Sequence, residues 1–76
     1  MEGIEFKIRF KSGDVGYFKP TCEITIEKAD EVIEYIGEGI RNEATGILKM
    51  LDLTDDKVTV INIKEIVTFG YSLVSD

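Results

Sequence analysis

The side chains that could carry out chemistry in this sequence are carboxylates, amines and a single thiol. The chain contains no histidine, which excludes a Ser-His-Asp or Cys-His arrangement and a histidine general base. Cys22 is the only cysteine, so no disulfide can form within the chain, and a lone thiol does not make a zinc site. We therefore expect no cofactor, no metal and no enzymatic activity.

Two short motifs resemble binding sites but fail on spacing. Asp52, Asp55 and Asp56 form an acidic turn that lacks the alternating ligands and central glycine of a calcium loop, so we interpret it as a solvated turn. The run 37–39, Gly-Glu-Gly, starts like a dinucleotide motif, but Asn42 occupies the position of the third glycine. This run also follows a helical segment, whereas the motif follows a strand, and there is no P-loop.

The clearest predicted element is an amphipathic helix. Its apolar residues have the spacing of one helical face: Ala29, Val32, Ile33, Ile36 and Ile40. Five carboxylates fall on the opposite side and form an acidic stripe: Glu27, Asp30, Glu31, Glu34 and Glu38. Gly37 and Gly39 weaken the last turns, and we expect the helix to end within residues 41–43. The acidic stripe is either a solvated face or a docking surface for a basic partner.

The first strand carries a basic counterpart to this stripe. Lys7, Arg9 and Lys11 alternate with apolar residues, which places them on one wet face of a strand. They either guard an edge strand against aggregation or bind an acidic partner, such as the acidic helix of a second copy. Single-stranded nucleic acid, stacked on Tyr17 or Phe18, is a further interpretation, although the net charge of −6 argues against it.

The remaining pattern predicts an α+β fold with an antiparallel, curved sheet and one packed helix. Residues 58–61 are strongly β-branched, which favours a central strand. Pro20 should end the second strand, and residues 72–76 should form a frayed tail. The expected order is ββ(β)αβββ, which also suits a small open barrel of Sm or SH3 type. We expect a turn or 3₁₀ step at residues 62–65. The expected strands are residues 4–10, 15–19, 47–53, 58–61 and 66–71.

The segment before the helix has two possible structures. Cys22, Ile24 and Ile26 alternate with polar residues, so residues 21–26 either form a third short strand or lead directly into the helix. On such a strand Cys22 would lie on the apolar face, where we expect a small buried hydrophobe. A reactive thiolate would need exposure and a nearby cation, for which Lys19 is the candidate in sequence.

The closing segment, residues 60–69, carries the pattern Val-Ile-Asn-Ile-Lys-Glu-Ile. It resembles the closing strand–turn–strand of many small bacterial and phage proteins, which often end in valine or isoleucine, Asn, three residues and Ile. The resemblance covers about ten residues of the chain. It implies no activity, because those proteins mostly have no assigned function.

Length and composition define the class of protein. The chain has 76 residues and a sequence pI near 4.5, which fits one domain, residues 1–76, with a small core that self-association could support. A single cysteine and the lack of any apolar run of membrane-spanning length lead us to expect a cytoplasmic protein. We expect a non-catalytic protein–protein interaction module that self-associates, with no small-molecule substrate. The alternative is a small acidic regulator that binds nucleic acid or a basic nucleic-acid-binding protein.

Overall fold

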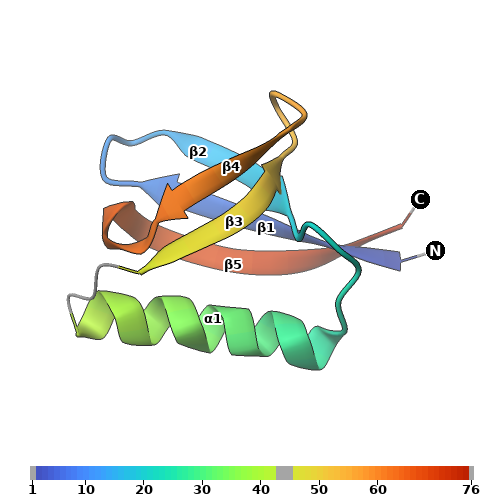
Figure 1. Cartoon of the computed structure of the whole chain (residues 1–76), viewed down its shortest axis with the longest axis horizontal. Coiled ribbons are helices and arrows are strands. Elements are labelled where there is room, and N and C mark those ends of the chain that lie inside the picture. Colours follow the sequence, from blue (N-terminus) through green and yellow to red (C-terminus); the bar gives the residue numbers. More distant parts are fainter. Residues whose placement is uncertain (1, 43–45, 76) are drawn as a thin grey trace.

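The computed structural model describes residues 2–42 and 46–75, which form one antiparallel sheet and one α-helix (Figure 1). The sheet is open, with strand order β4-β3-β2-β1-β5. This confirms the α+β prediction. The elements in chain order are β1 (Glu2–Phe10), β2 (Val15–Lys19), α1 (Ile26–Arg41), β3 (Ile47–Asp52), β4 (Lys57–Asn62), the 3₁₀ helix η1 (Ile63–Glu65) and β5 (Ile66–Ser75).

Strand β1 is the centre of the sheet and pairs with β2 on one side and β5 on the other. Strand β5 continues to Ser75, so the prediction of a frayed tail was wrong. The first residues of β1 extend beyond the end of β2, and β5 pairs with them through Ile4↔Leu73 and Glu2↔Ser75. The long ladder satisfies backbone groups that would otherwise have no partner in the sheet.

Strand β4 lies at an edge of the sheet, and the prediction of a central strand was wrong. It pairs only with β3, and its Val58 and Val60 side chains are 54% and 57% exposed. β-Branched residues favour the extended backbone of any strand, so their abundance does not separate an edge from the middle of a sheet. The consequence is an apolar surface that the fold itself leaves uncovered.

Residues 20–25 contain no strand and lead directly into α1. Thr25 caps the helix, because its side-chain oxygen accepts a hydrogen bond of 3.2 Å from the backbone N–H of Lys28. This cap makes Ile26 the first helical residue and ends the period-two alternation. Cys22 is exposed on this loop, so its expected burial was wrong.

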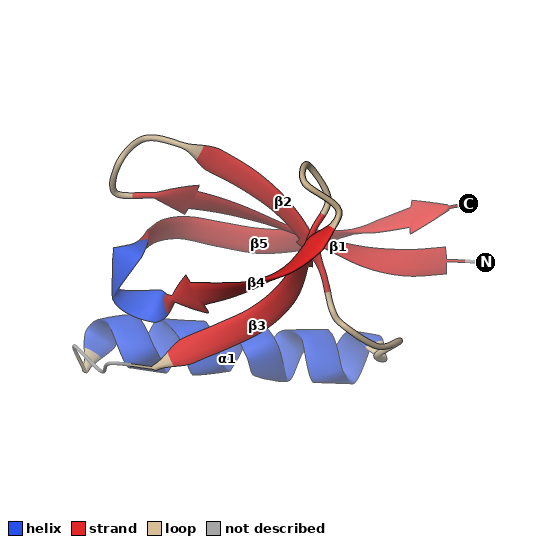
Figure 2. Cartoon of the chain, turned by 45° about the horizontal axis from the view of Figure 1, so that its top comes forward, coloured by secondary structure: helices blue, strands red, loops and turns tan. Residues whose placement is uncertain are grey.

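The core lies between the inner face of the sheet and the apolar face of α1 (Figure 2). The largest fully buried side chains are Phe6, Ile8, Ile36 and Ile63. Helix η1 occupies the predicted step before β5 and lies against the C-terminal half of α1, where Ile63 packs on Gly39. The predicted helix face is confirmed, and α1 ends at Arg41 as expected.

Candidate interaction surfaces

The five acidic residues of α1 are all exposed, but they have different roles. The carboxylate of Asp30 accepts a hydrogen bond of 2.6 Å from the hydroxyl of Tyr71, which links α1 to β5. This hydrogen bond, together with partial desolvation and the negative charge of Asp30, raises the pKa of Tyr71 above its ordinary value of 10.0. Asp30 therefore has a structural function within its own chain.

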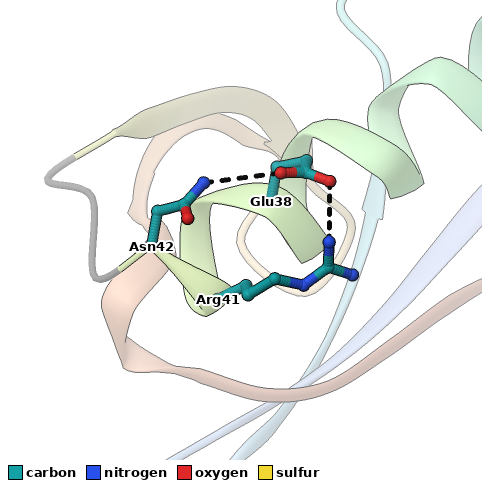
Figure 3. Close-up of polar contacts among 3 residues, drawn as sticks. All are labelled: Glu38, Arg41 and Asn42. Carbon is teal, nitrogen blue, oxygen red and sulfur yellow. Dashed lines mark hydrogen bonds and ion pairs between the residues drawn. The ribbon is translucent and has the colours of Figure 1, made fainter.

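Glu38 stabilises the end of the helix (Figure 3). One of its carboxylate oxygens accepts a hydrogen bond of 3.0 Å from Arg41, and the other accepts one of 3.4 Å from Asn42. Glu31 forms an exposed ion pair of 3.2 Å with Lys28. Within the part of the chain that the structure describes, only Glu27 and Glu34 of the acidic stripe have no polar side-chain partner. The stripe therefore offers few free carboxylates to a basic partner.

The three cations predicted on the first strand do not all lie together. Lys7 and Arg9 are exposed on the face of β1 that points away from the core. Lys11 lies beyond the end of β1, after an irregularity between Arg9 and Phe10, and its backbone N–H donates a hydrogen bond of 2.8 Å to the backbone carbonyl of Glu65 in η1. Neither Lys7 nor Arg9 forms an ion pair with a carboxylate among residues 2–42 and 46–75.

The strand registers place two further cations on the same side of the sheet as Lys7 and Arg9. Lys19 lies opposite Leu51, and Lys49 lies opposite Val60. Among the strand residues whose side chains the structure describes, Glu5 is the one carboxylate on this side. We call this side the outer sheet face, and its residues are Gly3, Glu5, Lys7, Arg9, Val15, Tyr17, Lys19, Ile47, Lys49, Leu51, Val58, Val60, Asn62, Thr68, Gly70, Ser72 and Val74.

Apolar side chains are interspersed with these cations. Ile47, Val58 and Val60 are each more than half exposed on β3 and β4. Tyr17 is 42% exposed and lies directly opposite Lys7, whereas Phe18, the other predicted stacking residue, is buried in the core. The outer sheet face is thus basic and partly apolar in a chain whose net charge is −6. Exposed apolar residues surrounded by polar ones are typical of interaction sites.

A depression of about 380 Å³ lies on this face over β1, β5 and the start of β2. Lys7, Arg9, Val15, Thr68 and Ser72 line it, together with residues 69–71. The space over Gly70 is open, because a Cβ atom added there would meet no heavy atom within 4 Å. The lining side chains on this face include two cations and the hydroxyl groups of Thr68 and Ser72 but no carboxylate, so the depression favours a ligand that carries negative charge.

Sequence reasoning missed most of this face. Lys19, Lys49 and Gly70 each alternate with core residues of their own strands, and that signal is present in the sequence. The register that brings them beside Lys7 and Arg9 depends on which strands pair, and local alternation does not contain that information.

In the described part of the chain, no group of three or more His, Cys, Asp and Glu side chains could hold a metal ion. No helix in those residues is long and apolar enough to cross a membrane. No protein-family model, curated protein or solved structure matches the chain.

Proposed function

We propose that this protein is a non-catalytic interaction module whose outer sheet face docks an acidic segment of a partner protein. The observation that carries the proposal is the combination of four cations with half-exposed Val, Ile and Tyr side chains on one face of an acidic chain. Such a surface matches a partner that is both negatively charged and partly apolar, since potentials across an interface are complementary and its core is apolar.

Two copies of the chain fit this surface less well. Pairing two outer sheet faces would oppose four cations with four cations, which like-charge repulsion disfavours. The acidic stripe of α1 faces solvent on the other side of the core, so its contact with an outer sheet face is head-to-tail and does not close into a dimer. Exposed ion pairs contribute about 0–1 kcal/mol each. We therefore propose weak self-association that high salt dissolves, which light scattering at low and high salt measures.

A pair of charge-reversed variants tests the proposed function. Lys7→Glu with Arg9→Glu reverses two cations of the outer sheet face, and Lys57→Glu with Lys64→Glu makes the same change in net charge at exposed positions away from it. The probe is a fluorescein-labelled peptide of alternating Glu and Leu, followed by anisotropy. We expect the first variant to weaken binding at least about tenfold, or about 1.4 kcal/mol, and the second to retain most of it.

An equal loss of peptide affinity in both variants would show that binding depends only on net charge, and this would contradict the proposal. Peptide affinity retained in both variants would contradict it as well. Circular dichroism of each variant verifies that the fold survives the substitutions.

One observation favours a second candidate function, binding of single-stranded nucleic acid. Tyr17 is half-exposed and lies opposite Lys7, the arrangement of a stacking platform beside a phosphate contact. An oligo-dT probe in the same assay tests it: salt-dependent binding that Tyr17→Ala abolishes would support this function, and absence of binding would dismiss it.

A further inference from the structure

The depression on the outer sheet face has space for one side chain of a bound partner. Gly70 leaves open space between Thr68 and Ser72 on β5, and Val15 contributes an apolar group from β2. Lys7 and Arg9 lie on β1 between these two strands, opposite Gly70 and Thr68 respectively. The two cations therefore run along the middle of the depression, with Val15 on their β2 side and the open space over Gly70 on their β5 side.

These two cations are available to a ligand. Both are exposed, and neither forms an ion pair with any carboxylate in the described residues. The cross-strand neighbours of these cations are uncharged. Thr68 and Val15 lie opposite Arg9, and Gly70 and Tyr17 lie opposite Lys7. A ligand that places carboxylates here gains two ion pairs without displacing one within the protein.

The arrangement favours an acidic protein segment over nucleic acid. Phe69 and Tyr71 are among the lining residues, but their register opposite Ile8 and Phe6 turns their side chains to the inner face, where they pack against the core. Tyr17 does not line the depression. The depression therefore offers no aromatic ring on which a base could stack, whereas stacking supplies much of the affinity for single strands. An aliphatic or benzyl side chain needs only open space beside apolar atoms, and Gly70 leaves such space on β5 next to Lys7, whose side-chain stem is apolar.

The acidic stripe of a second copy is also a poorer match. Its carboxylates lie on the solvent side of α1, and no apolar residue lies within the stripe itself. The occupant is therefore better supplied by a different protein, in which acidic residues flank an apolar one.

We propose that the open space over Gly70 in this depression receives a single Leu-sized or Phe-sized side chain from an extended acidic segment of a partner protein, while Lys7 and Arg9, which lie beside it along β1, pair with carboxylates of the same segment. This inference rests on the proposed function, because it specifies where on the outer sheet face the partner is anchored. Gly70 is then the residue that determines which partner side chain fits.

Filling the depression tests the proposal. Gly70→Leu places a side chain into the open space, and Gly70→Ala fills it only in part. The probes are two labelled peptides, one with a central Leu between Glu residues and one with Ala in its place. For the wild-type protein we expect the Leu peptide to bind about tenfold more tightly than the Ala peptide. Gly70→Leu should remove this difference, and Gly70→Ala should reduce it.

The controls separate this inference from the proposed function. If neither peptide binds the wild-type protein, the proposed function itself fails. If both bind equally, or if Gly70→Leu leaves the preference for Leu intact, the outer sheet face still docks acidic segments but the depression is not the anchor site. Thr21→Leu adds the same side chain at an exposed position of the loop before α1, away from the outer sheet face, and this matched variant should leave the preference unchanged.

Discussion

Asp30 illustrates how a residue of a charged surface can serve the fold. Its position on the helix predicted an exposed carboxylate, and the structure shows that this carboxylate also binds the hydroxyl of Tyr71 on β5. The sequence separation of 41 residues explains why local pattern could not reveal the pair. A partner that binds the acidic stripe would have to compete with this hydrogen bond.

The Tyr71 hydrogen bond predicts a loss of stability at high pH. Because the folded pKa of Tyr71 is raised above 10.0, its contribution is fully present below pH 10.0 and disappears as the pH rises through the folded value. The Tyr71 ring, followed by ¹³C NMR, should titrate above 10.0, and thermal stability should fall in the same range. Asp30→Asn removes the charge and should lower the pKa of Tyr71. An unchanged pKa in that variant would contradict the assignment.

Single residues also show where sequence reasoning failed. Cys22 was expected on a buried strand face, because residues 21–26 alternate in polarity. Thr25 instead uses its side chain to cap α1, and this local hydrogen bond begins the helix. Lys11 lies outside β1, which ends at Phe10 after an irregularity in its pairing with β5, and alternation alone does not predict such an irregularity.

At the scale of elements, α1 was the most predictable part of the molecule. Its 3.6-residue period is a local property, so the sequence predicted both the apolar face and the end of the helix. The two glycines near that end have opposite environments. A Cβ on Gly37 would lie 3.9 Å from Phe69, an ordinary contact, whereas one on Gly39 would lie 2.9 Å from the fully buried Ile63.

This contrast predicts opposite effects of the same substitution. Gly37→Ala should stabilise the protein by about 0.5–1 kcal/mol, because alanine favours the helix and meets no obstacle. Gly39→Ala should destabilise it, because overpacking against Ile63 costs about 1–3 kcal/mol and exceeds the gain in helix propensity. Urea unfolding of the two variants measures both effects, and equal stabilisation by the two would refute the packing of η1 on α1.

The strands were predicted in number and approximate position, but not in their neighbours. The segment 58–61 was assigned to the middle of the sheet from its β-branched residues, and residues 72–76 were assigned to a tail. Both errors concern pairing: β4 has one neighbour, and β5 continues alongside the start of β1. Pairing is a long-range property, so period-two alternation identifies strands without ordering them.

At the scale of the whole molecule, charge is separated across the core. Carboxylates cover the solvent side of α1, and four cations lie on the outer sheet face. The two surfaces are on different sides of the core, so at physiological salt, where screening acts over about 8 Å, each presents its own charge to a partner. The net charge of −6 therefore conceals a basic surface that composition could not reveal.

Docking of an acidic protein segment on the outer sheet face can be located on the molecule itself. In a titration of the ¹⁵N-labelled protein with the unlabelled Leu-centred acidic peptide, amide shifts identify the contact residue by residue. We predict the largest shifts at residues 7–9 of β1, at Val15 and Tyr17 of β2, and at residues 68–72 of β5, with little change along α1. Shifts concentrated on α1, or no shifts at millimolar peptide, would contradict docking on the outer sheet face.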